Sequence, residues 1–312
     1  SNTDTMYYNS WKRMALHFDP ATYHMMHSSH ITFSQRAAAL KYRTGTVYTA
    51  KQRFRFGYAV SDRCILCGQP DGGHHMAAAC QSLSKMYTCR HHQAGRLIMN
   101  AVLAGDRGNE VVMMDVGKVN MDEGPASMPH RIPLHTLPSC MSDEAKRAAA
   151  SCSIPDGFMY KAATTQTMET YTVLEIKFCR DTDPTGQLAR ARTQHSRLVE
   201  ALTAAAPGAV VQMEVILIGV SGAVYTEHTK DPMVRLGVTR GAWDKLKYRL
   251  NVLAVQQLHW IHVNKLIQES AMQPGVHGTK RFVLKKGRCV CLGGQIRKAN
   301  VNAPQHRKRK SS

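Results

Sequence analysis

Acidic residues, aromatic residues and long apolar runs are all scarce in this 312-residue sequence. Only 22 Asp and Glu residues stand against 41 Lys and Arg, which gives a formal net charge of +19 at pH 7. A hydrophobic content of 43% over this length is enough for one sizeable core, so the composition argues against a wholly disordered chain. A folded protein with this charge favours an extended polyanion as its partner, and a merely solvated basic surface is the alternative.

No apolar stretch approaches the roughly 18–20 residues that cross a bilayer. The opening residues, SNTDTMYYNSWKR, contain no signal-peptide core either. We therefore expect a soluble, intracellular protein without a membrane partner. The sequence also lacks an initial methionine, as expected for a segment of a longer polypeptide.

Cysteine occurs nine times, an odd number, and a chain of this length does not need a disulfide framework. The stretch CILCGQPDGGHHMAAAC contains Cys64, Cys67 and Cys80, with His74 and His75 between them. With His75 the spacing is Cys-x2-Cys-x7-His-x4-Cys, which supplies the ligands of a closed, structural or nucleic-acid-docking zinc site. Buried thiols beside a surface histidine are the alternative reading. Residues near enough to replace one ligand are His74, Cys89, His91 and His92.

The remaining pattern predicts an α/β fold with a mixed sheet. Before residue 154 we expect a helix at 84–105, a strand at 109–117, and a loop or insertion at 117–150 with a short helix at 142–151. After it we expect strands at 155–162 and 169–178, a helix at 185–206, a strand at 209–222 and a helix at 242–270. The apolar run at 209–222 is typical of a central strand covered on both faces. The expected regions are 1–62, 63–105, 106–270 and 271–312.

Charged residues at the first two strands after residue 154 suggest a metal-dependent hydrolytic centre. Asp156 opens one strand, while Glu175 and Lys177 lie two apart on the next and so point to one face. If the two strands form a hairpin, Asp156 and Glu175 can share a Mg²⁺ or Mn²⁺ ion, and Lys177 can polarise water or stabilise phosphate charge. The alternative is a buried ion pair in an ordinary hairpin. The same short patterns recur without strand context at Asp71 and at Glu144.

The helix that follows offers polar groups near this hairpin. Gln187, Arg190 and Gln194 share one side of it, so Gln194 is a candidate to orient water and Arg190 to bind phosphate. Asp181 and Asp183 precede the helix and are either further ligands or capping charges.

Two other segments are candidates for nucleic-acid contact. Residues 31–60 mix basic with aromatic side chains, which suits a surface that contacts the nucleic-acid backbone and stacks on bases, and Arg43, Lys51 and Arg53 are the predicted phosphate contacts. A helical pair with a purely structural aromatic core explains the same pattern equally well. The basic residues 271–312 suggest nucleic-acid binding or nuclear import, and a solvated end is the alternative.

A family resemblance joins these motifs. The order RTGT, CILCGQPDGGHHMAAAC, YTCRHHQAGRLI and PDGF…LEIKFCRDTDPTGQLARARTQH, from Leu40 to Tyr225, resembles the carboxy-terminal region of non-LTR retrotransposon polyproteins. In that family a Cys-Cys-His-Cys knuckle precedes a PD-(D/E)xK endonuclease. The endonuclease nicks target DNA, and the upstream reverse transcriptase primes on the exposed 3′ hydroxyl.

The resemblance implies a restriction-endonuclease-like mixed sheet flanked by helices, preceded by a helical and zinc-knuckle region. It implies structural Zn²⁺, catalytic Mg²⁺ or Mn²⁺, a nuclear location, and DNA, element RNA and the reverse transcriptase portion as partners. The implied zinc ligands are Cys64, Cys67, His75 and Cys80, and the implied catalytic residues are Asp156, Glu175 and Lys177.

The sequence departs from the family at two points. Ile154 stands where a basic residue usually precedes the Pro-Asp pair, and no Tyr-x-Asp-Asp motif is present, so the chain is not expected to copy RNA. A second hypothesis therefore stays open, namely a catalytically inactive zinc-knuckle module from a decayed element that still binds nucleic acid.

Overall fold

The computed structural model describes residues 9–116 and 128–272. The four strands are β1 (Val111–Met114), β2 (Gly157–Lys161), β3 (Thr170–Cys179) and β4 (Val210–Gly219). The helices are α2 (Phe33–Arg43), α3 (Ala50–Arg55), α4 (Ser84–Leu103), α5 (Asp143–Cys152), α6 (Pro184–Ala205), α7 (Asp231–Arg235) and α8 (Arg240–Met272). Predictions for 117–127 and for the basic segment after residue 272 lie outside the described residues.

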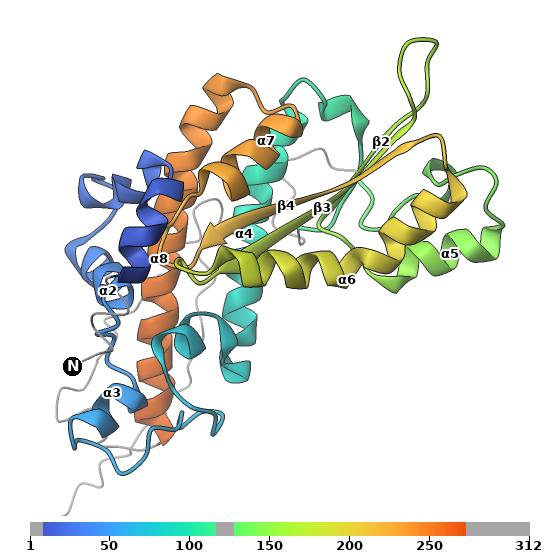
Figure 1. Ribbon diagram of the computed structural model, residues 1–312. Coiled ribbons are helices and arrows are strands. Elements are labelled where there is room, and N and C mark those ends of the chain that lie inside the picture. Colours follow the sequence, from blue (N-terminus) through green and yellow to red (C-terminus); the bar gives the residue numbers. More distant parts are fainter. Residues whose placement is uncertain (1–8, 117–127, 273–312) are drawn as a thin grey trace, which may run out of the picture.

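The strands form one mixed sheet in the order β1-β2-β3-β4. Figure 1 labels β2, β3 and β4 of this sheet. The pairs β1–β2 and β2–β3 are antiparallel, while β3 and β4 are parallel and joined through α6. The predicted mixed α/β fold is confirmed at this level, and the β2–β3 hairpin is the one expected from the sequence.

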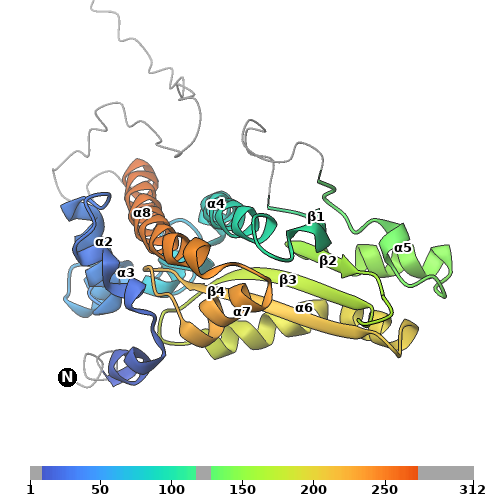
Figure 2. The same ribbon diagram turned by 90° about the horizontal axis from the view of Figure 1, so that it is seen from above.

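Side-chain alternation along β3 explains the layers of the molecule. Leu174 and Ile176 pack in a core with α4 and α8, whereas Tyr171 and Val173 pack in a second core with α5 and α6. Figure 2 accordingly shows α4 and α8 on one face of the sheet and α6 on the other. Because side chains alternate between faces, Glu175 lies on the α6 side with Val173.

The prediction of a central strand at 209–222 is wrong, since β4 lies at the edge of the sheet. Its apolar run has a different cause. Helices cover both of its faces, and the chain after β4 folds back on it, with Val224 bridging to Ile218 and α7 in contact with the strand. A strand covered in this way is as apolar as a central one.

The last helix, α8, holds the sheet and the N-terminal region together. Its residues Leu250 and Ala254 enter the core that the sheet shares with α4, while Leu258 and Ile261 enter a separate core with α2 and the cysteine-rich segment. Within the described parts of the chain, no helix has both the length and the apolar character needed to cross a membrane.

Candidate zinc knuckle and carboxylate site

The four predicted zinc ligands lie together. The ligand atoms of Cys64, Cys67, His75 and Cys80 are all within 4.8 Å of one another. The Sγ atom of Cys80 is 3.9 Å from that of Cys64 and 3.7 Å from that of Cys67. Tetrahedral zinc with Zn–S bonds near 2.3 Å separates two sulfurs by about 3.8 Å, so this cluster could hold a zinc ion.

Backbone hydrogen bonds build the turn that carries the first two cysteines. The Gly68 amide donates to the Cys64 carbonyl at 2.8 Å, and the Cys64 amide donates to the Gln69 carbonyl at 2.7 Å. Gly68 has a φ of 74°, a conformation that glycine adopts without strain. Burial raises the pKa of the Cys64 thiol to about 12 and also raises the pKa of Cys80. A bound zinc ion supplies the positive charge that stabilises thiolates in such a site.

The possible substitute ligands lie elsewhere. His74, Cys89, His91 and His92 are outside the cluster, which in the described part of the chain consists of Cys64, Cys67, His75 and Cys80 alone. His91 instead contacts a carboxylate of the sheet.

Asp71, which repeats the Pro-Asp pattern, is a structural residue. Its Oδ2 atom accepts hydrogen bonds from the Ala50 amide at 2.7 Å and from Lys265 Nζ at 2.9 Å. Lys265 also donates to Glu269, and all three charged side chains are buried. Burial alone lowers the pKa of Lys265, but Asp71 and Glu269 outweigh it and the pKa lies above its usual value. This network attaches the cysteine-rich segment to α8.

Replacing Lys265 should therefore destabilise the fold. Lys265→Met leaves two buried carboxylates without their shared cation, and we expect a loss of about 3–5 kcal/mol in the free energy of unfolding. Urea titration measures this loss. Arg147→Met is the control, because Arg147 pairs with Asp143 at an exposed site and its loss should cost under about 0.5 kcal/mol. Equal stability of the two variants would contradict a supporting role for Lys265.

The β2–β3 hairpin brings the predicted carboxylates side by side. Gly157 pairs with Leu174, and Asp156 Oδ2 accepts a hydrogen bond of 2.7 Å from the amide of Ile176, the residue after Glu175. Glu175 is buried and forms an ion pair with Lys177. Asp156 thus lies beside the stretch of β3 that carries the Glu175–Lys177 pair, and the charge of Glu175 acts on it.

Two histidines that the sequence did not assign to this site hold the carboxylates. His91 of α4 lies 2.8 Å from Asp156 Oδ1, and His195 of α6 lies 2.8 Å from Glu175 Oε2. The other ring nitrogen of His195 is 2.9 Å from the Ser153 hydroxyl. His195 shares the buried side of α6 with Ala191, Leu198 and Leu202, and this apolar periodicity is the sequence signal that could have found it.

The pKa values of Asp156 and Glu175 are shifted in opposite directions. Burial and the neighbouring Glu175 raise the pKa of Asp156 above its usual value, although His91 opposes the shift. Burial alone raises the pKa of Glu175, but hydrogen bonds from His195 and the charge of Lys177 outweigh it and leave the pKa below its usual value. Carboxylates with opposite shifts are typical of functional sites.

Every carboxylate oxygen here has a protein partner. Only two of these partners, His91 and Lys177, are partly exposed, with 25% and 24% of their side chains accessible. Apart from the Cys₃His cluster, no three metal-type side chains of the described residues have ligand atoms within 4.8 Å of one another. A cation at Asp156 and Glu175 would therefore have to replace His91 or Lys177 as a partner.

The polar residues predicted on α6 differ in exposure from the histidine of that helix that contacts Glu175. Gln194 and Arg190 are exposed, and His195 is the α6 side chain that reaches Glu175. The catalytic role of Gln194 stays a prediction. Asp183 caps α6 by accepting from the Gly186 amide at 3.3 Å, while Asp181 is buried and accepts from the Ser221 hydroxyl at 2.9 Å.

Two of the predicted nucleic-acid contacts are wrong. Arg43 is buried and donates to the carbonyls of Thr22 and Ser221 at 3.1 and 3.0 Å. Burial lowers the pKa of Arg43, and the charge of Asp181 opposes that shift. Arg53 is also buried, with its guanidinium 5.8 Å from the centre of the Tyr48 ring. Lys51 and Arg190 are exposed and stay predictions.

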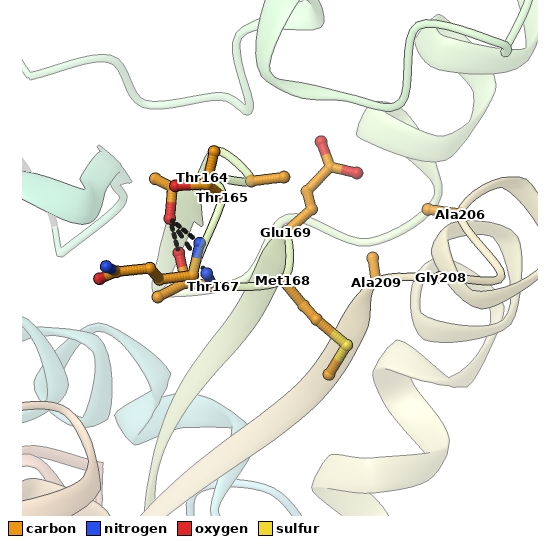
Figure 3. A pocket seen from close by; sticks show the side chains of 10 residues that line it. Thr164, Thr165, Thr167, Met168, Glu169, Ala206, Gly208 and Ala209 are labelled. Carbon is orange, nitrogen blue, oxygen red and sulfur yellow. Dashed lines mark hydrogen bonds between the residues drawn. The ribbon is translucent and has the colours of Figure 1, made fainter.

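A surface hollow lies far along the hairpin from the carboxylates. Residues 163–169 line it together with Ala206, Gly208 and Ala209, and Figure 3 shows Thr164 and Thr167 bonded to each other across the turn. Glu169 accepts from the Tyr160 hydroxyl at 3.0 Å. The polar groups here stabilise the turn, so the hollow offers no convergent chemistry.

Fold and site together define a class, a mixed α/β protein with a four-stranded sheet and a Cys₃His cluster that could hold zinc. No protein-family model matches the chain, and no curated protein gives a significant sequence match.

Proposed function

We propose that the protein is a divalent-metal-dependent DNA endonuclease of a non-LTR retrotransposon, which nicks target DNA to prime reverse transcription. The observation that supports this proposal is that the β2–β3 hairpin places Asp156 against the backbone of Ile176, between Glu175 and its ion-pair partner Lys177 in the sequence. The reverse transcriptase portion of the same polyprotein and element RNA are its proposed partners, and the nucleus is its proposed location.

The free-energy cost of burying these charged side chains in the sheet supports a functional role. Glu175 and Lys177 occupy an otherwise apolar strand, and Asp156 is buried beside them. Burying charged groups costs several kcal/mol unless they are paired, and apolar residues of similar volume are often at least as stable. Two buried carboxylates on neighbouring strands, one paired with His91 and the other with Lys177 and His195, are better explained by chemistry than by stability.

Each residue has a definite task in the proposed reaction. Asp156 and Glu175 would hold a Mg²⁺ or Mn²⁺ ion, which supplies an activated water and neutralises the scissile phosphate. Lys177, partly exposed beside Glu175, directs its charge to the water or the phosphate. His91 and His195 orient the two carboxylates.

The zinc knuckle has a proposed structural task, because a closed site keeps no open position for substrate. It anchors the start of α4. The Tyr87 hydroxyl donates to the Met76 carbonyl at 2.9 Å, and Arg90 donates to the Ala77 carbonyl at 2.8 Å. His91 is the next residue, so the knuckle fixes the helix that presents His91 to Asp156.

An inactive nucleic-acid-binding module is the second candidate. The observation that favours it is that all four carboxylate oxygens are already bonded to protein groups. The two candidates differ in one measurable respect, since both bind DNA but only the first cuts it in a divalent cation.

DNA affinity should depend steeply on salt. If exposed basic residues contact phosphates, the logarithm of the binding constant falls linearly with the logarithm of salt concentration. Lys51→Ala and Arg190→Ala should each lower the slope by about one, measured by fluorescence anisotropy on a duplex. Arg147→Ala should leave the slope unchanged, because Arg147 already pairs with Asp143 on α5. A salt-independent affinity would show that the positive charge is incidental to binding.

A further inference from the structure

Three large aromatic side chains are exposed at the end of α3. Phe54, Phe56 and Tyr58 are 51%, 62% and 75% accessible, and they lie within five residues of one another. Aromatic rings bury more apolar area than most side chains, so folding normally places them inside. A cluster of exposed rings therefore indicates an interaction surface.

The backbone at this point is fixed rather than loose. The Tyr58 amide donates to the Arg53 carbonyl at 2.8 Å, and the Gly57 amide donates to the Phe54 carbonyl at 3.0 Å. These two bonds, with Gly57 at a φ of 74°, form the Schellman motif that ends many helices. Because hydrogen bonds hold this turn in one conformation, the segment loses little conformational entropy when the rings bind a partner.

The surroundings of the rings are basic. Lys51, Arg55 and Arg63 are exposed in the same stretch, and Asp62 is its one acidic residue. Arg63 donates to the Gly68 carbonyl at 3.0 Å, which ties this segment to the turn of the zinc knuckle. An anionic partner fits this charge, whereas an apolar protein surface does not account for it.

We infer that Phe54, Phe56 and Tyr58 form a stacking platform for the unpaired bases of a single-stranded nucleic acid, with Lys51 and Arg55 near its phosphates. Every base has an aromatic face, so stacking tolerates any sequence. In a duplex those faces are covered by neighbouring base pairs, and the rings cannot reach them. Binding itself needs no cleavage; its role beside a nick rests on the proposed endonuclease function.

The test compares a short oligothymidine with a duplex of the same length, both by fluorescence anisotropy at one salt concentration. The triple variant Phe54→Ala/Phe56→Ala/Tyr58→Ala should bind the oligothymidine about 100-fold more weakly. Its duplex affinity should change less than about threefold, because duplex contacts are mainly to phosphates. Phe33→Ala is the control, since Phe33 is 82% exposed at the start of α2 and should leave both affinities unchanged.

A second variant reports base stacking directly through its fluorescence. Tyr58→Trp should keep wild-type affinity, and its added indole fluorescence should be quenched by the oligothymidine beyond the change seen in wild-type protein. Unchanged oligothymidine binding by the triple variant would overturn the inference, and so would an equal loss on both ligands. A wild-type dimer that the triple variant dissociates, seen by sedimentation, would assign the surface to self-association instead. Failure of the endonuclease proposal can be distinguished from failure of this inference, because the protein would then not nick DNA in Mg²⁺ but would still bind the oligothymidine.

Discussion

Glu175→Gln should reduce Mg²⁺- or Mn²⁺-dependent DNA nicking by at least about 100-fold, because it removes a negative charge that the cation needs. Asp156→Asn should act in the same way. Duplex affinity should persist or increase, since negative charge leaves a site that faces phosphate. The nicking rate and the DNA affinity are measured on the same protein preparations, so that a loss of cleavage can be distinguished from a loss of binding.

Glutamine is preferable to alanine at position 175. Alanine leaves Lys177 and the buried His195 without their shared acceptor, which is expected to cost about 3–5 kcal/mol of stability. Glu144→Ala is the matched control, because it carries the same Glu-x-Lys pattern on the exposed surface of α5. Asp71→Ala is not an inert control, since Asp71 holds the buried Lys265. If Glu175→Gln nicks DNA at the wild-type rate, the catalytic assignment is contradicted and the inactive binding module becomes the better hypothesis.

Freshly prepared, reduced protein should contain about one zinc ion per chain, and Cys64→Ser should lose it. Metal binding and folding are one equilibrium in such sites, worth about 10–16 kcal/mol in zinc-finger peptides, so we expect local unfolding and a large fall in Tm. Elemental analysis and circular dichroism measure the two effects. Cys140→Ser, at an exposed cysteine outside the cluster, should keep both metal and Tm.

The zinc-free variant should also lose nicking, although zinc takes no part in the chemistry. Tyr87 and Arg90 attach α4 to the knuckle, and unfolding of the knuckle releases His91 from Asp156. Glu175→Gln, in contrast, should lose nicking with its zinc retained. Reduced protein that contains no zinc would contradict the structural role of the knuckle.

The features predicted well from the sequence are those set by local spacing. Cys64 and Cys67 share one turn, and the stretch up to Cys80 is short enough for the ligands to meet. The hairpin that joins Asp156 to Glu175 is likewise a contact between neighbouring strands. Helices α4, α6 and α8 follow directly from apolar periodicity.

The features missed depend on contacts between distant segments. Arg43 looked like a surface residue because its partner, Ser221, is 178 residues away. His91 reaches Asp156 only after α4 packs on the sheet, across a separation of 65 residues. The edge position of β4 could not be predicted for the same reason. An apolar strand sequence indicates that both faces are covered, but it does not give the position of the strand in the sheet.

A plasmid-nicking assay with Mg²⁺ or Mn²⁺ tests the central claim most directly. Wild-type protein should convert supercoiled plasmid to open circles only when the cation is present, and chelation should stop the conversion. Lys177→Ala should bind the plasmid but nick it at least about 100-fold more slowly, because the site loses its directing cation. Plasmid that is bound but never nicked in either cation, or a Lys177→Ala variant that nicks at the wild-type rate, would contradict the assignment of a nuclease centre to Asp156, Glu175 and Lys177.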